Sequence, residues 1–132
     1  MSFVSVHQYF LLLAIYRLMR LIARGRFDEG LHFARNFDLD AQLVYTAKAN
    51  RLSLELSVWA NTKPEQISCK FKDFIDTLDC ITELRFVVES CLKCAPTTVE
   101  YIRSSLSYAR KRLNLIKNKV SWFKLKTKNN LV

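Results

Sequence analysis

The helix-ending and helix-starting residues between positions 22 and 49 constrain the fold more than any other feature of this sequence. Gly25 can adopt the left-handed conformation that ends a helix, and Asp28 with Glu29 places carboxylates at the positive start of the next helix. Asp40 has the side chain of a good N-cap for a third helix. The stretch therefore predicts three helices joined by two tight turns.

Composition extends this prediction to the whole chain. Half of the 132 residues are apolar, only two are glycine and two are proline, and the long periodic runs leave little room for a sheet. We expect one all-α domain, with helices over about 6–24, 27–37, 40–59, 64–78 and 81–95 and a last helix from 97 or 98. Pro64 suits a first helical position, Pro96 ends the fifth helix, and Thr97 or Thr98 can cap the sixth.

The residues around the Asp40 cap predict one further local contact. Leu39 and Val44 flank the Asp40 cap at the spacing of a hydrophobic staple.

Six helices with short connections fit either a compact bundle or a stack of antiparallel pairs. In a stack, the two end helices lack neighbours, so we expect exposed apolar surface at both ends.

The first 16 residues contain no charged side chain, and residues 10–16 form an unbroken apolar run. A membrane span needs about 20 predominantly apolar residues, and a signal peptide needs positive charge ahead of its apolar core. Polar residues dilute this run, and Arg17 and Arg20 follow it. We therefore expect a helix that is buried among neighbouring helices, or one that truncation has left without them, and no membrane insertion.

Four cysteines, at positions 69, 80, 91 and 94, fall inside helical pattern rather than in loops. We interpret them as reduced thiols of a cytosolic protein. A zinc site remains the alternative, because Cys91 and Cys94 form a C-x-x-C, although structural zinc usually takes such pairs from turns.

No catalytic motif is found. The two histidines, His7 and His32, stand beside apolar residues, and the sequence has no phosphate loop, nucleophile elbow or H-E-x-x-H pair. Asp73, Asp76 and Asp79 share one helix side and are interpreted as a solvated face, with a divalent-ion site as the alternative. We expect no enzyme activity, no cofactor, no metal and no small-molecule substrate.

Charge is concentrated near the C-terminus. The twelve basic and twelve acidic residues up to Glu100 cancel, so the net charge of +9 belongs to the last 32 residues. The apolar residues there fill successive a and d positions of a heptad: Val99, Ile102, Leu106, Ala109, Leu113, Ile116, Val120 and Phe123. The flanking e and g positions are basic and supply the candidate partner-binding residues, which are Arg103, Arg110, Arg112, Lys117, Lys119 and Lys124.

These basic flanks disfavour self-pairing of the heptad seam, so we expect it to dock on a helix with acidic flanks. The alternative is a cationic edge helix that packs on the fifth helix at its N-terminal end and frays beyond Lys117. We divide the chain into a helical solenoid segment, residues 1–120, and a basic C-terminal tail, residues 121–132, that is frayed.

Several segments resemble the Rod family, the large kinetochore-associated subunit of the Rod, Zwilch and Zeste White complex. The likeness rests on Arg24–Glu29, Phe33–Ala34, Phe37–Asp40, Leu43–Tyr45, Lys48–Ala49, Phe86–Leu92 and Leu106–Leu113. They cover about the middle two-thirds of the chain in the family's order. The resemblance implies an armadillo-like α-solenoid, of which this chain is a fragment, whereas members of the family also carry a β-propeller and many further repeats.

The resemblance also implies a non-enzymatic scaffold at the kinetochore and in the cytoplasm. Its implied partners are Zwilch and Zeste White, the adaptor Spindly with the dynein motor, and the Mad checkpoint proteins, in mitotic spindle checkpoint signalling. Two alternatives stay open. One is nucleic-acid binding through the last helix, where Tyr108, Trp122 and Phe123 interleave with basic residues. The other is a vesicle-tethering scaffold, because a related complex shares Zeste White.

Overall fold

The computed structural model describes residues 6–59, 64–93 and 99–129, and for residues 58, 59, 64 and 120–129 it describes the backbone alone. Over these residues the chain forms six helices and no strand, which confirms the all-α prediction. The helices are α1 (Val6–Ala23), α2 (Phe27–Asn36), α3 (Gln42–Trp59), α4 (Pro64–Asp79), α5 (Leu84–Lys93) and α6 (Val99–Asn129).

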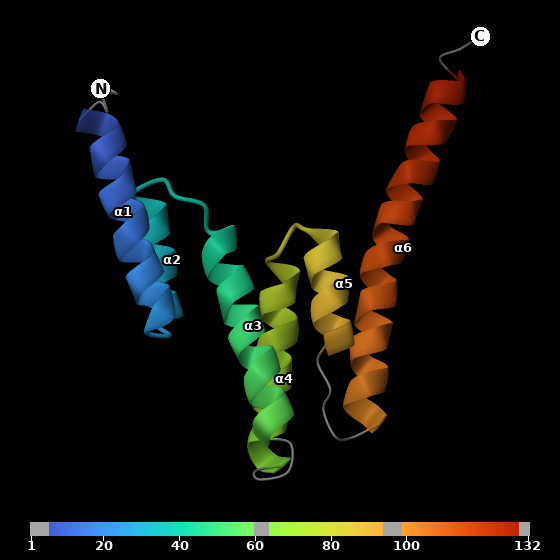
Figure 1. Ribbon diagram of the computed structural model, residues 1–132. Helices are drawn as coiled ribbons and strands as arrows, with labels where there is room; N and C mark the ends of the chain where they lie inside the picture. The colour runs from blue at the N-terminus through green and yellow to red at the C-terminus, as the bar shows by residue number, and fades with distance from the viewer. Residues whose placement is uncertain (1–5, 60–63, 94–98, 130–132) are drawn as a thin grey trace.

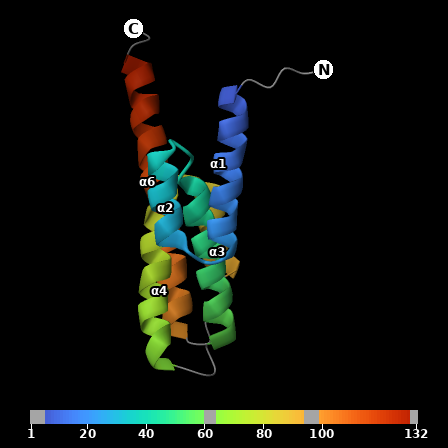
Figure 2. The same cartoon turned by 90° about the vertical axis from the view of Figure 1, so that its left-hand side faces the viewer.

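Successive helices run in opposite directions (Figure 1), and α5 packs on α3 as well as on α6. The α1–α2 pair forms one end, α3 and α4 pack together in the middle, and α5 and α6 form the other end. Seen from the side, α1 and α6 project beyond the helices between them (Figure 2). The architecture is therefore the predicted stack of antiparallel pairs with two open ends.

Two apolar clusters hold the stack together. The smaller joins α1, α2 and α3 through Leu18, Ala34 and Val44, all fully buried, with Leu39 packed against them. The larger joins α3 to α6, and Phe74 of α4 is its largest fully buried side chain. Because α3 contributes to both clusters, it is the element that connects the two halves.

The predicted turn at Gly25 is confirmed in detail. Gly25 has φ +76°, and the chain there makes both bonds of a Schellman motif. The Gly25 N–H donates to the carbonyl of Ile22 at 3.0 Å, and the Arg26 N–H donates to that of Leu21 at 3.0 Å. A second left-handed residue, Asp38 with φ +55°, follows α2 and was not foreseen.

The predicted cap of the third helix is also confirmed. The Asp40 Oδ1 atom accepts a hydrogen bond from the Gln42 N–H at 3.0 Å. Leu39 and Val44 belong to the same apolar cluster, as a staple requires. The predicted caps Thr97 and Thr98 lie outside the described residues.

The predicted start of the fifth helix is wrong by three residues. Periodicity placed Ile81 in that helix, whereas α5 begins at Leu84 and Ile81 lies in the turn after α4, where it is nevertheless buried. The Gln42 side chain ties this turn to α3, because its Nε2 donates to the Cys80 carbonyl at 2.9 Å and its Oε1 accepts from the Thr82 N–H at 3.1 Å. The start of α5 thus depends on contacts between this turn and α3, which the local sequence pattern does not show.

Candidate interaction surfaces at the two ends of the stack

The face of α6 that packs on the rest of the molecule is not the heptad seam. Ser105 and Ala109 are buried, and Tyr101 and Tyr108 pack against the larger cluster. The seam lies about a quarter-turn away around the helix. Its described members other than Ala109 stay exposed, namely Val99, Ile102, Leu106, Leu113 and Ile116. The alternative of an edge helix that packs on the fifth helix agrees with the contact between α5 and α6, and these five seam residues stay exposed beside that contact.

Four of the six candidate partner-binding residues lie exposed along α6: Arg103, Arg110, Lys117 and Lys119. The backbone of Lys124 belongs to α6, and its side chain lies outside the described ones. Arg112 differs, because it is half-buried and hydrogen-bonded within the chain. Its guanidinium donates to the carbonyls of Ile81 at 2.6 Å and Leu78 at 3.2 Å, so it satisfies acceptors at the end of α4.

Tyr108 belongs to the same polar group. Its hydroxyl donates to Asp79 Oδ1 and accepts a hydrogen bond from the Arg112 guanidinium at 3.3 Å. Burial, together with the hydrogen bond to the Asp79 carboxylate, raises the pKa of Tyr108 to about 12. This cluster joins α4 to α6 and fixes which side of α6 faces the core.

A groove of about 470 Å³ runs between α4 and α6. Phe71 and Ile75 line its α4 side, and Arg103 and Lys111 supply two cations on the α6 side. The Phe71 and Tyr101 rings pack with centroids 4.9 Å apart. The groove thus combines apolar side chains of α4 with two cations and the hydroxyl groups of Ser104 and Ser107 on α6.

The cysteines and aspartates form no metal site among the described residues. No three His, Cys, Asp or Glu side chains come together there. Cys69 and Cys80 are exposed, Cys91 is buried, and Cys94 lies outside the described residues. Asp73 pairs with Lys48 at 3.4 Å, and Asp79 accepts from Tyr108. His7 and His32 are exposed.

The opposite end of the stack carries more exposed apolar surface than we expected from a packed first helix. In α1 only Ala14 and Leu18 are buried, whereas Val6, Tyr9, Phe10, Leu12 and Tyr16 are at least 60% exposed. By length and composition alone, α1 is the one described helix that could cross a membrane, which is weak evidence for a span. The prediction of exposed apolar surface at both ends of the stack is confirmed.

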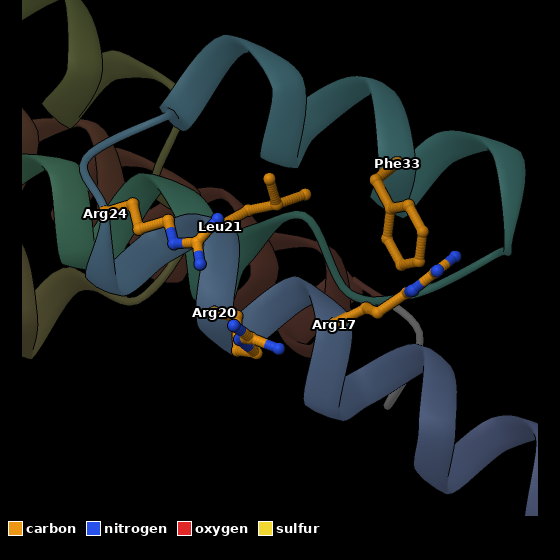
Figure 3. A pocket seen from close by; sticks show the side chains of 5 residues that line it. All are labelled: Arg17, Arg20, Leu21, Arg24 and Phe33. Atoms are coloured by element: carbon orange, nitrogen blue, oxygen red, sulfur yellow. The ribbon is translucent and has the colours of Figure 1, made fainter.

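A hollow of about 300 Å³ lies between α1 and α2, lined by Arg17, Arg20, Leu21, Arg24 and Phe33 (Figure 3). Sequence reasoning missed this site. The signal was present in the spacing, because residues 17, 20 and 24 share one side of a helix.

Comparisons with known proteins agree with this architecture. A sequence model of the family "KNTC1 first ARM-repeats domain" matches residues 20–131. Kinetochore-associated protein 1 of Mus musculus is 39% identical over 101 residues, and that of Homo sapiens is 36% identical over 99 residues; each alignment covers 74% of this chain. No solved structure matches.

The stack of antiparallel helix pairs with open ends is that of an armadillo-like α-solenoid segment. The chain belongs to the family of the first ARM-repeats domain of KNTC1, in agreement with the resemblance to Rod. The aligned residues make up about 4% of the length of either curated relative.

Proposed function

We propose that this chain is a non-enzymatic scaffold segment that acts at the kinetochore. The observation that carries the proposal is the family match over residues 20–131, since both curated relatives are named for their association with the kinetochore. The open-ended stack supports it, because such solenoids offer extended surfaces to other proteins.

The finer proposal follows the resemblance to Rod. The parent assembly would act in spindle checkpoint signalling and dynein recruitment, with Zwilch, Zeste White, Spindly and the Mad proteins as partners, in the cytoplasm and at kinetochores. Affinity purification of the epitope-tagged chain from mitotic cells tests this. We expect kinetochore proteins to be enriched and Zwilch to be absent, because the part of the chain that the structure describes is helical and includes no propeller. A proteome dominated by vesicle-tethering factors would contradict the proposal.

Within this function, the heptad seam of α6 is proposed as the docking face. Its described apolar residues are mostly exposed, and Arg103, Arg110, Lys117 and Lys119 flank it with positive charge. A helix with acidic flanks complements this face, whereas a second copy would set like charges against each other. Arg112 is excluded from the docking set, because its guanidinium is already engaged by the carbonyls of Leu78 and Ile81.

Charge reversal tests the docking face. Replacing Arg110, Lys117 and Lys124 by glutamate should remove a co-purifying partner without lowering the melting temperature. The matched control reverses three cations away from the seam, Arg35, Lys72 and Lys93, which are exposed. An unchanged interactome for the seam variant would leave α6 as a solvated basic face. Salt-dependent binding of a random oligonucleotide, lost in the seam variant alone, would favour the nucleic-acid alternative.

A further inference from the structure

We propose that the groove between α1 and α2 binds an amphipathic helix of a partner protein, with the partner's acidic residues on Arg17, Arg20 and Arg24 and its apolar residues on Phe10 and Leu13. This site is at the opposite end of the stack from the α6 seam (Figure 1). It goes beyond the proposed function and does not rest on it, because the argument uses only the geometry of this chain.

The basic half of the groove is built on α1. Arg17, Arg20 and Arg24 recur at steps of three and four, so they share one side of the helix. Figure 3 shows Arg17 extending toward the Phe33 ring, with Leu21 further along α1 and Arg24 in the turn that follows the helix. Among the described residues, none of the three guanidinium groups forms an ion pair with a carboxylate. The three cations therefore have no carboxylate partner there, and Arg20 lies over the Tyr16 ring, 6.0 Å from its centroid.

The apolar half continues from the basic half without a break. A hollow of about 490 Å³ is lined by Phe10, Leu13 and Phe37, and it shares Arg17, Arg20 and Phe33 with the basic hollow. Phe10 is 67% exposed and Phe37 is 54% exposed. The Phe33 and Phe37 rings pack with centroids 4.5 Å apart and form a rigid aromatic wall. Apolar side chains of a ligand would be removed from water here.

The distribution of charged residues around the groove favours an acidic partner helix over a second copy of this chain. Residues 6–27 contain no aspartate or glutamate, so this stretch of chain offers an acidic ligand no like charge. The nearest acids in sequence, Asp28 and Glu29, line a neighbouring hollow that shares Leu21 and Phe33 with the basic one. Glu29 pairs there with Arg26 at 3.6 Å. A second copy of this chain is a poor occupant, because the α6 end is also basic.

Helix electrostatics set the direction of the bound ligand. Acidic residues are favoured in the first turn of a helix, where the macrodipole is positive. A ligand helix that places its acidic first turn on the arginines and its later apolar residues on Phe10 and Leu13 therefore runs antiparallel to α1.

Fluorescence anisotropy with the full 132-residue chain tests the proposal. The probe is a fluorescein-labelled peptide of about five helical turns, with glutamates in its first two turns and leucines at helical spacing in the rest. We expect saturable binding that weakens as salt rises from about 50 to 300 mM. A control peptide with lysine in place of each glutamate keeps the apolar face, and we expect it not to bind.

Two pairs of variants locate the site. Arg17→Gln with Arg20→Gln and Arg24→Gln should weaken binding about tenfold, since each exposed pair contributes modestly. Arg35→Gln, Lys72→Gln and Lys93→Gln make the same change in net charge elsewhere and should leave the affinity within about twofold. Phe10→Ser with Leu13→Ser should abolish binding, because both substitutions remove apolar surface from the groove. Leu54→Ser with Leu92→Ser, at two exposed positions outside the groove, should not.

Several outcomes would overturn the proposal. One is absence of saturable binding, and another is equal loss in the groove variants and their controls. A third is preference for a membrane. In that case the chain would sediment with vesicles of phosphatidylcholine and phosphatidylserine, the groove variants would not sediment, and the peptide would stay unbound. That result would assign the apolar end of α1 to a lipid surface.

Discussion

At the scale of single residues, the two glycines of this chain have opposite roles. Gly30 lies inside α2, and a methyl group there would meet Val44 at 3.6 Å and Leu18 at 3.7 Å, which is ordinary van der Waals contact. Because alanine loses less backbone entropy in a helix and fills this contact, we expect Gly30→Ala to stabilise the fold by about 0.5–1 kcal/mol. Thermal or urea unfolding measures the change.

Gly25 provides the control for that prediction. It has φ +76°, where a Cβ atom is strained, and a methyl group would lie 2.2 Å from the Arg51 guanidinium. Gly25→Ala should therefore destabilise the fold by roughly 1–2 kcal/mol. Equal effects of the two substitutions would contradict the assignment of Gly25 to the turn and Gly30 to the helix interior.

Tyr108 links stability to alkaline pH. Its pKa in the folded chain is about 12, against an ordinary value of 10.0, because the hydroxyl is partly buried and donates to Asp79. A raised pKa means that the folded state holds the proton more tightly, so this contribution is complete below pH 10 and is lost as pH rises toward 12. We expect Tyr108→Phe to remove this loss and to remove a tyrosinate absorbance step near pH 12. An unchanged alkaline titration in the variant would contradict the assignment.

At the scale of elements, α6 has an anchored part and an unanchored part. Tyr101, Ser105 and Tyr108 pack on the larger cluster, and Arg112 is the last described residue of α6 bonded to another element. The helix then continues to Asn129, beyond the predicted boundary at residue 120. An isolated helical extension is only marginally stable in water, because helices owe most of their stability to tertiary packing.

Hydrogen exchange tests the proposed division into a solenoid segment and a frayed tail. Amides of α6 up to about Arg112 should be protected, and those of residues 121–129 should exchange orders of magnitude faster. Helix α4, whose Phe74 and Leu78 side chains are fully buried, serves as the internal reference for full protection. Uniform protection from Val99 to Asn129 would mean that the tail is held by contacts of its own, and would contradict a frayed tail.

At the scale of the whole molecule, the two ends of the stack have similar surfaces. Both end helices leave apolar residues exposed, and both carry arginine or lysine beside them. Like charge at the two ends disfavours end-to-end association of copies, while each end remains attractive to an acidic helix. The molecule is thus suited to lie between partners rather than to polymerise.

Much of this could be predicted from local sequence. Gly25 and Asp40 marked two turns, and the scarcity of glycine and proline excluded an extended sheet. These signals act within a few residues, through backbone conformation and the first hydrogen bonds of a helix, so a single sequence carries them in full. The resemblance to Rod supplied the choice of a solenoid over a compact bundle, which periodicity alone left open.

The sequence by itself therefore determined where the helices are, except for the start of α5, and the tertiary structure decided which of their faces are buried. On α6 the heptad seam is the more regular apolar pattern, yet the buried face runs through Ser105 and Tyr108 and ends at Arg112. The Arg112 guanidinium fixes this face of α6 by donating to the carbonyls of Leu78 and Ile81, about thirty residues earlier in the chain. Buried carbonyls at a helix end need donors, and only the folded chain brings Arg112 to them.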